Sequence, residues 1–197
     1  LDWVLFRRII RFGMPNGIQL MLETLGFTLF ALLVGRLGTV SLAAINLTFS
    51  INTLAFLPMV GMGVAVSTLV GRYLGKDKPD LAETSTKSAL YLSLIYMGMM
   101  SVGYLVIPEF FLKPFAIHSD LEALEPVMSI CIVLLRFVAV YSIFDAFYIV
   151  FSSAIKGAGD TWFVMWVTTL VSWCVMVVPV YLACNVFGWG LYVAFSF

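Results

Sequence analysis

Charged side chains are scarce in this sequence: Asp, Glu, Lys and Arg make up 11% of its 197 residues, and it has one histidine. An average soluble domain carries about twice that share of charge. Apolar residues make up 62% of the chain, and the mean hydropathy is +1.05. A soluble core of this length could not bury so much apolar surface. The composition therefore predicts an all-α, polytopic membrane protein.

The patterns that mark enzymes, metal centres and nucleic-acid binding are missing as well. The net charge is zero, so nucleic acid is not an expected partner. Cys131, Cys174 and Cys184 stand singly in apolar stretches without zinc spacing, and we interpret them as thiols packed in the core. No nucleophile–base pair or phosphate-binding loop is recognisable, so we expect neither an enzyme nor a cofactor.

Long apolar runs divide the chain into membrane spans. We expect five complete spans and a partial sixth, at about 13–35, 42–73, 84–107, 124–155, 161–187 and 188–197. The aromatic and arginine side chains between Asp2 and Phe12 predict an interfacial segment, which would place Pro15 in the first turn of the helix that follows. The chain begins with Leu1, and its last run is too short to cross about 30 Å of hydrocarbon. We therefore interpret it as part of a longer chain, cut at both ends.

Basic residues gather at one end of the predicted bundle. Eight of the eleven lie before the first span, around the turn after the second, or after the fourth: Arg7, Arg8, Arg11, Arg72, Lys76, Lys78, Lys87 and Lys156. Arg36 and Lys113 lie at the other end, and Arg136 lies inside a span. Because Lys and Arg are enriched in cytoplasmic loops, we expect the start of the chain to lie on the cytoplasmic side of the inner cell membrane.

Glu23 lies about ten residues inside the first apolar span. On a wheel of 3.6 residues per turn, Asn16, Gln19 and Glu23 fall within about 60° of one another and make one narrow polar stripe. A carboxylate at this depth is costly and by default marks an ion or proton pathway or a ligand site. The alternative is a polar residue that only hydrogen-bonds a neighbouring helix.

A second polar stripe lies on the fourth span, where Tyr141, Asp145, Tyr148 and Ser152 share one helical face. Asp145 is as far from the cytoplasmic end of its span as Glu23 is from the end of its own, roughly 15 Å at 1.5 Å per residue. Two carboxylates at one depth can share a cation or a proton. Alternatively, the two helices face different neighbours.

Other polar residues inside the spans have weaker signals. Arg136 is half a helical turn out of phase with Asp145, so it would neutralise an acid elsewhere or extend toward the outer face. Asn46 and Ser50 form a stripe on the second span that is suited to helix–helix hydrogen bonds or to ligand contact.

Pro58 and a run of small residues shape the second span. Because proline lacks a backbone N–H, we expect a hinge there: the helix should bend near Leu54 and leave a carbonyl free. Small residues recur every fourth position after the proline, which predicts close packing against another helix: Gly63, Ser67, Gly71 and Gly75.

Several ordered segments resemble one family of membrane transporters. Arg11-Phe-Gly-Met-Pro-Asn-Gly17, ahead of Glu23, is similar to the start of the second half of MATE (multidrug and toxic compound extrusion) transporters. The loop Gly35-Arg-Leu-Gly-Thr39, the helix segment Phe56-Leu-Pro58 and the turn Lys156-Gly-Ala-Gly-Asp-Thr161 resemble later parts of the same half. The set covers almost the whole chain.

The resemblance implies a fold of two six-helix bundles around a central cleft, with residues 1–197 as most of the carboxy-terminal lobe. It implies an antiporter that exports organic cations or drugs in exchange for Na⁺ or H⁺. In the NorM-like branch, Glu23, Asp145 and Tyr141 match residues of the cation site. Ser50 stands where that branch has an asparagine-type ligand, so the choice between Na⁺ and H⁺ stays open. The implied partners are a cationic small molecule, the lipid bilayer and an amino-terminal lobe of the same chain.

Two other functions remain open from the sequence. A lipid-linked oligosaccharide flippase of the same superfamily would favour a large basic cleft, for which only Arg136 is present. In a non-transporting scaffold or channel subunit, Glu23 and Asp145 would be unrelated. A separation of under roughly 10 Å between the two carboxyl groups would favour coupling, because unit charges interact appreciably over that range.

The charge bias gives a direct test of orientation. A cysteine introduced at Asp80, with the native cysteines removed, should resist an impermeant thiol reagent added outside intact cells, because the predicted loop around it is cytoplasmic. Labelling should become complete after the membrane is permeabilised. Ready labelling in intact cells would reverse the orientation.

Overall fold

The computed structural model describes residues 2–35, 39–116 and 121–174. These residues form helices and no strand, in the order α1 (Trp3–Gly35), α2 (Thr39–Leu74), α3 (Pro79–Val106), α4 (Pro108–Ala116), α5 (Leu121–Gly157) and α6 (Thr161–Ser172). The predicted all-α class is confirmed. The rest of the predicted fifth span and the partial sixth, together 175–197, lie outside the described residues.

Three of the described helices are long and apolar enough to cross a membrane: Leu42–Leu74, Pro79–Val106 and Val127–Gly157. They correspond to the predicted second, third and fourth spans. α6 is a shorter apolar helix that begins at Thr161, the first residue of the predicted fifth span.

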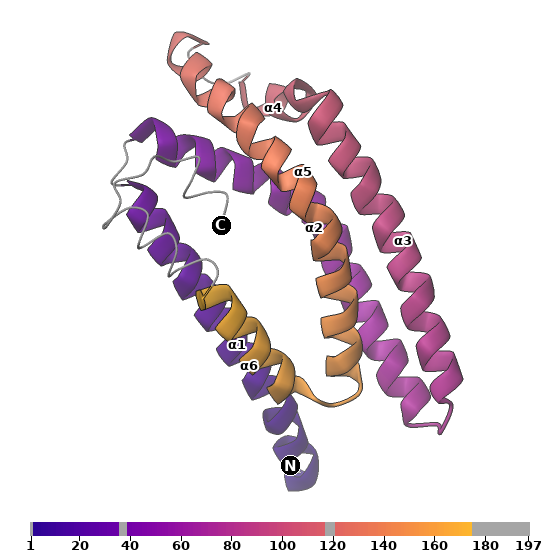
Figure 1. Cartoon of the computed structure of the whole chain (residues 1–197). Helices are drawn as coiled ribbons and strands as arrows, with labels where there is room; N and C mark the ends of the chain where they lie inside the picture. Colours follow the sequence, from indigo (N-terminus) through magenta and orange to yellow (C-terminus); the bar gives the residue numbers. More distant parts are fainter. Residues whose placement is uncertain (1, 36–38, 117–120, 175–197) are drawn as a thin grey trace.

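The helices form two groups, which Figure 1 shows set at an angle to one another. In one group α5 packs against both α2 and α3, and in the other α1 packs against α6. α2 and α5 run in the same direction and α3 runs against them. The turn between α5 and α6 joins the groups near the N-terminal end of the molecule (Figure 1). α1 and α6 therefore form a second layer beside the three-helix group.

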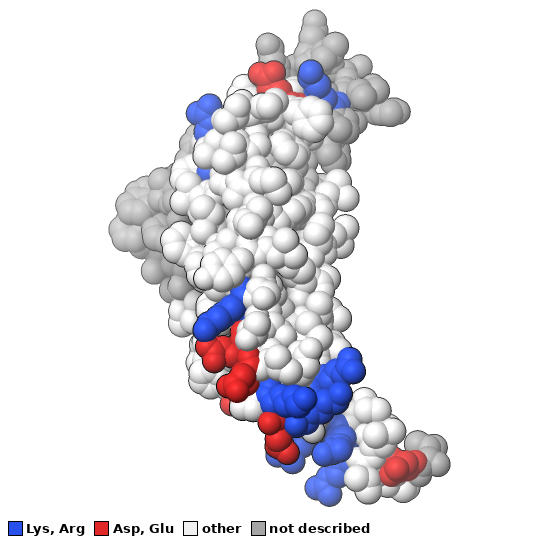
Figure 2. Space-filling view, turned by 90° about the vertical axis from the view of Figure 1, so that its right-hand side faces the viewer, with Lys and Arg blue, Asp and Glu red and all other residues white. Residues whose placement is uncertain are grey.

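The basic residues lie mainly at one end of this arrangement. The start of α1, the α2–α3 turn and the α5–α6 turn lie together at the lower end of Figure 1, and Figure 2 shows Lys and Arg gathered there. Successive spans therefore run in opposite directions, as the distribution of basic residues requires.

Local signals explain the turns at this end. Asp77 adopts a positive φ of 55°, and Pro79 opens α3 as its first residue, where a missing N–H costs nothing. Gly159 has a φ of 99° in the next turn, and the Asp160 carboxylate caps α6 by accepting from the Phe163 N–H at 3.1 Å. α3 begins five residues earlier than the predicted span.

The predicted break before the first span is wrong. α1 is one helix from Trp3, and Pro15 lies well inside it rather than in its first turn. A proline in a helix interior weakens the surrounding backbone bonds. Here the Asn16 side-chain amide donates to the Phe12 carbonyl oxygen at 3.3 Å, adding a donor beside the proline.

A short helix, α4, was missed in the predicted outer loop. It starts at Pro108 and brings Phe111 onto the end of α3, where its ring meets that of Tyr104 edge-on at 4.8 Å. A Cβ at Gly103 would lie 3.2 Å from the Phe111 ring, so the absence of a side chain there permits the contact. α4 therefore closes this end of the three-helix group.

The proline of α2 is accommodated within a continuous helix. Figure 1 shows α2 changing direction near its middle, and Pro58 lies in that central part of the helix. The Tyr96 hydroxyl of α3 donates to the Ala55 carbonyl oxygen at 2.8 Å, three residues before the proline. α3 thus supplies a hydrogen-bond donor next to the position where Pro58 interrupts the backbone hydrogen bonds of α2. Membrane helices that contain proline need such donors from their neighbours.

Small residues bring α2 and α5 together, as the four-residue repeat predicts. A Cβ at Gly63 would lie 2.7 Å from the Ser153 hydroxyl, and one at Gly157 would lie 2.5 Å from the Ser67 carbonyl oxygen. Helices in lipid associate through this kind of close packing and through interhelical hydrogen bonds. Gly75 at the end of the repeat differs, because its Cβ would approach only its own preceding turn.

This close approach predicts a large difference between two Gly→Ala changes. Gly157→Ala should lower stability by about 1–3 kcal/mol, because the methyl group meets backbone atoms that cannot move away. Gly61→Ala, on an open face of α2 with no atom within 4 Å, should be neutral or stabilise by up to about 1 kcal/mol. Thermal unfolding in detergent measures both, and equal midpoints would contradict the packing.

Candidate functional site

The polar residues of α1 form a connected group with one residue of α5. Gln19 is buried, and its Nε2 donates to the Glu23 Oε1 at 2.7 Å. The same Nε2 lies 3.4 Å from the Tyr148 hydroxyl of α5. Glu23 is only half-buried. The Gln19 amide therefore links the carboxylate of the first layer to the three-helix group.

Asp145 lies in a groove between α5 and α6 with a volume of ≈ 600 Å³. Its wall carries the rings of Phe147, Tyr148, Phe151 and Phe163, the hydroxyls of Ser152 and Thr168, and aliphatic side chains. Most of the lining is apolar, with a few polar groups and one carboxylate. This composition is typical of sites for small organic molecules.

Tyr148 connects the two carboxylates. It lines the groove with Asp145, receives the Gln19 hydrogen bond, and lies within electrostatic range of both Glu23 and Asp145. The two acids predicted to act together thus share Tyr148 as a common neighbour.

Tyr141, which the family resemblance placed beside Asp145 at the cation site, lies one helical turn before Asp145 on α5. It is partly buried against the core cluster that contains Leu134, Leu135 and Val138, and it is not among the residues that line the groove. Its position one turn from Asp145 keeps it in electrostatic range of that carboxylate.

The remaining candidates do not join this group in the described part of the chain. Asn16, Asn46 and Ser50 are exposed, and the amide of Asn16 and the hydroxyl of Ser50 bond to carbonyls of their own helices, Ser50 to the Asn46 oxygen at 2.8 Å. Arg136 is also exposed. Pro58 lies on α2, away from the groove lining, next to a smaller hollow that it shares with Tyr96.

Sequence reasoning missed the contribution of α6. Phe163 and Thr168 line the groove, and Thr161, Thr168 and Ser172 share one face of α6 at positions i, i+7 and i+11. This sparse stripe of hydroxyls is the signal that could have indicated the helix. Only the Asp160 cap marks the start of this helix, and the cap says nothing about which face meets α5. Its position beside α5 follows from tertiary packing.

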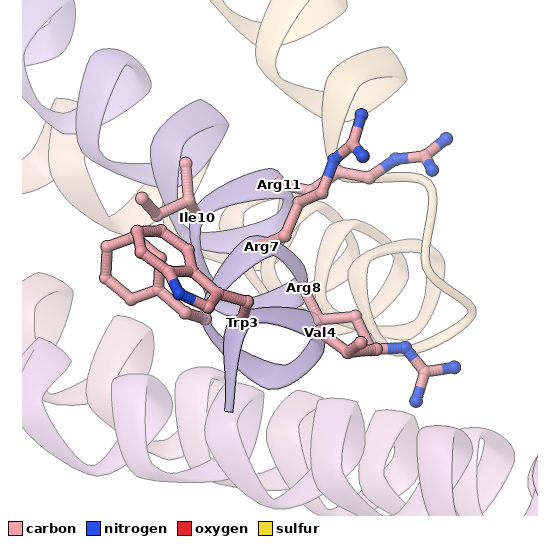
Figure 3. Close-up of a pocket in the computed structure, with 7 residues that line it drawn as sticks. Trp3, Val4, Arg7, Arg8, Ile10 and Arg11 are labelled. Atoms are coloured by element: carbon pink, nitrogen blue, oxygen red, sulfur yellow. The ribbon is translucent and has the colours of Figure 1, made fainter. Parts of the chain in front are cut away.

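A larger hollow at the start of α1 is the surface of a single helix. All of its lining residues come from the first turns of α1, and Trp3 is 74% exposed. Figure 3 shows Arg7, Arg8 and Arg11 extending to one side of the helix and Trp3 and Ile10 to the other. This separation of basic and apolar side chains fits the interfacial segment predicted from the sequence.

No cluster of three or more His, Cys, Asp or Glu side chains occurs among the described residues. A hard monovalent cation near Glu23 would have to take most of its oxygen ligands from amide, hydroxyl or carbonyl groups. In the structure the Gln19 amide turns its NH₂ group, and not its oxygen, toward the Glu23 carboxylate.

Comparison with known proteins identifies the family of the chain. The profile of the MatE family matches residues 15–182. Multidrug resistance protein MdtK of Edwardsiella ictaluri is 28% identical over 174 residues, covering 87% of this chain and 36% of that protein. A probable multidrug resistance protein NorM of Brucella suis is 28% identical over 160 residues, covering 81% and 34%. The chain thus spans about a third of the length of the curated relatives it matches.

Solved structures of other proteins share this fold. An outward-facing multidrug resistance MATE family transporter of the MOP superfamily superposes with a TM-score of 0.82 at 22% sequence identity, over 95% of this chain and 40% of that one. The similarity shows that the helices described above adopt the arrangement of part of that transporter.

The groove predicts a difference in reactivity between two positions on α5. A cysteine at Ser152, which lines the groove, should react with a small water-soluble methanethiosulfonate reagent in the purified complete protein. A cysteine at Ser142, which is 3% exposed, should react at least about tenfold more slowly, because the reagent needs a solvated thiolate. Equal rates would show that the groove is closed to water.

Proposed function

We propose, from the premise that the chain belongs to the MatE family, that it forms most of the carboxy-terminal lobe of a secondary antiporter. This antiporter exports organic cations or drugs in exchange for Na⁺ or H⁺. The names of its relatives, multidrug resistance proteins, support export of small molecules. The amino-terminal lobe of the same chain would complete the substrate cleft.

The observation that carries this proposal is the chemistry of the groove. Asp145 supplies a negative charge in a largely apolar wall, and Phe147, Tyr148 and Phe151 place aromatic rings on the same helix. Aromatic faces and a carboxylate both attract organic cations, and each interaction strengthens where water is excluded. A flat or lipophilic cation is the substrate class that such a wall binds best.

Glu23 and Asp145 would provide the exchange. A proton or Na⁺ that neutralises either acid weakens the attraction for a positively charged substrate, because the site loses the charge that held it. Binding of the ion and of the cation are then mutually unfavourable, and this linkage is reciprocal. Alternating occupancy of this kind lets an inward ion gradient drive the substrate outward.

The groove does not suit the flippase alternative. A lipid-linked oligosaccharide carries a pyrophosphate, which Lys or Arg side chains would bind. None of the described residues that line the groove is basic, and Arg136 lies outside it. The scaffold alternative leaves unexplained why Gln19 hydrogen-bonds to both Glu23 and Tyr148, and why Tyr148 shares a groove with Asp145.

The end of the molecule that carries most of the Lys and Arg side chains would face the cytoplasm of the inner membrane. With this orientation, the turn that joins α5 and α6, the two helices that line the groove, would lie on the cytoplasmic side. The direction of export then follows from the ion gradient.

Charge-neutralising changes at the two acids test the mechanism. In the full-length protein reconstituted into vesicles, Glu23→Gln and Asp145→Asn should each reduce gradient-driven uptake of tetraphenylphosphonium by about 100-fold or more, because an amide mimics the neutral acid but cannot release a proton. Thermal unfolding should change by less than about 1 kcal/mol, since the shape of each side chain is kept.

Thr24→Val serves as the matched control on α1. The Thr24 hydroxyl is exposed and bonds only to the Leu20 carbonyl of its own helix. This variant should transport at the wild-type rate. Wild-type rates from both acid variants as well would leave Glu23 and Asp145 as structural residues.

A further inference from the structure

Residues 3–12, at the start of α1, form a helix with a basic face and an apolar face. At about 100° per residue, Arg7, Arg8 and Arg11 fall within an arc of about 100°. The large apolar side chains fall within about 180° on the other side: Trp3, Leu5, Phe6, Ile9, Ile10 and Phe12. Figure 3 shows this separation directly, with the arginines on one side and Trp3 and Ile10 on the other. The segment is therefore amphipathic along its whole length.

The apolar face is open in the described part of the chain. Its six side chains are between 41% and 74% exposed. Phe12 lies at the α5–α6 turn, where a Cβ on Gly159 would be 3.7 Å from its ring. From there the first turns of α1 extend past the end of the other helices (Figure 1). A contiguous apolar surface of this kind marks a site of interaction rather than a surface in contact with water.

The three arginines are also free to interact. None of them forms an ion pair with a carboxylate among the residues that the structure describes. The carboxylate closest to them in sequence, Asp2, caps the helix: its Oδ1 accepts from the Val4 N–H at 3.0 Å. A guanidinium group stays charged at any physiological pH and binds phosphate oxygens through two parallel N–H donors. The basic face is therefore suited to phosphate groups.

One surface offers partners to both faces at once. In a lipid leaflet the headgroup phosphates lie directly above the acyl chains, so a helix lying in the interface places basic side chains on the first and apolar side chains among the second. A dissolved phosphate would satisfy the arginines alone and leave the apolar face in water. Charge complementarity favours anionic lipids over zwitterionic ones, because they attract basic side chains at the membrane surface.

Pro15 makes it easier for this segment to follow the membrane surface. Proline lacks the N–H that would bond to the Arg11 carbonyl one turn earlier, and sharp bends in helices occur mostly at proline. A Cβ at Gly13 or Gly17, on either side of the proline, would meet no atom within 4 Å. Close packing therefore does not oppose a change of direction at these two positions.

We propose that residues 3–12 bind the surface of a lipid leaflet that contains anionic phospholipids. The arginines lie on the headgroup phosphates, and the apolar face lies among the upper parts of the acyl chains. This inference goes beyond the proposed function, because it holds whatever the substrate and the coupling ion are. It gives α1, the helix that carries Glu23, a direct contact with the lipid surface.

The test uses the full-length protein without native cysteines, reconstituted into phosphatidylcholine vesicles with and without phosphatidylglycerol. A cysteine at Ile9, on the apolar face, carries a nitrobenzoxadiazole label, and a cysteine at Val4, on the basic side and 73% exposed, is the matched control. With phosphatidylglycerol present, a lipid that carries a spin label on its acyl chain should quench the label at position 9. The label at position 4 should be quenched far less, because it faces the headgroups and water.

Removal of the basic face should weaken this binding. The quenched fraction at position 9 gives the ratio of membrane-bound to free segment at a fixed lipid composition. The triple change Arg7→Gln, Arg8→Gln and Arg11→Gln should lower this ratio about 100-fold, because each basic side chain near an anionic surface strengthens binding about fivefold.

A second triple variant controls for net charge. Arg72→Gln, Lys76→Gln and Lys78→Gln remove three exposed basic side chains around the α2–α3 turn, at the same end of the molecule. They lie outside the amphipathic segment, so the ratio should change less than about threefold. An equal loss in both triple variants would mean that net charge, and not residues 3–12, controls the interaction, and the proposal would be wrong.

Three other results would overturn the proposal. A label at position 9 that stays in water in every vesicle would show that the segment does not bind lipid. If the label is shielded from both water and the quenching lipid in phosphatidylcholine alone, another part of the protein covers the apolar face. If inorganic phosphate added to phosphatidylcholine vesicles brings about the same quenching as phosphatidylglycerol, the arginines respond to phosphate itself and not to an anionic lipid surface.

Discussion

Close contact between α2 and α5 is the constraint on which the rest of the structure depends. Hydrocarbon surrounds a membrane protein, so burying apolar side chains between helices gains little. The helices must instead approach closely enough for dispersion contacts and interhelical hydrogen bonds. Gly63 and Gly157 permit this at one end, and the Cys131 thiol, which donates to the Ala44 carbonyl at 3.3 Å, adds a polar contact at the other. α3 then adds the Ser101 hydroxyl bond to the Ala139 carbonyl.

The layer of α1 and α6 is attached differently. Its described polar connection to the three-helix group is the Gln19–Tyr148 contact at 3.4 Å, which is longer than a typical strong hydrogen bond. One layer is thus held by close helix packing, and the other by a longer polar contact.

Much of the fold was predictable from the sequence because hydropathy reports membrane spans directly. The second, third and fourth spans were located to within a few residues at most ends. The errors came from local chemistry: Pro15 sits inside a helix with help from Asn16, Pro79 opens α3 before the apolar run begins, and α4 is too short for hydropathy to detect.

The candidate site was predictable only in part. Helical periodicity placed Gln19 and Glu23 on one face, and Asp145 and Tyr148 on another, without showing that the two faces meet. Tyr141 and Tyr148 lie on the same stripe of α5, so periodicity cannot tell which one reaches α1. The crossing of the helices decides this, and it brings Gln19 to Tyr148. Phe163 and Thr168 were missed because the stripe on α6, formed by the hydroxyls of Thr161, Thr168 and Ser172, has no charged side chain to set it apart from ordinary helix-packing residues.

The exposed hydroxyls of α2 have a consequence for insertion into the bilayer. Ser50 and Thr53 each donate to a carbonyl one turn earlier, at 2.8 and 2.7 Å. A hydroxyl satisfied in this way presents mainly its carbon atoms to its surroundings, so it crosses a low-dielectric medium without an unmet polar group. The same bond uses the hydroxyl proton and leaves the lone pairs of the oxygen free, so each hydroxyl keeps its acceptor side for a donor or a cation.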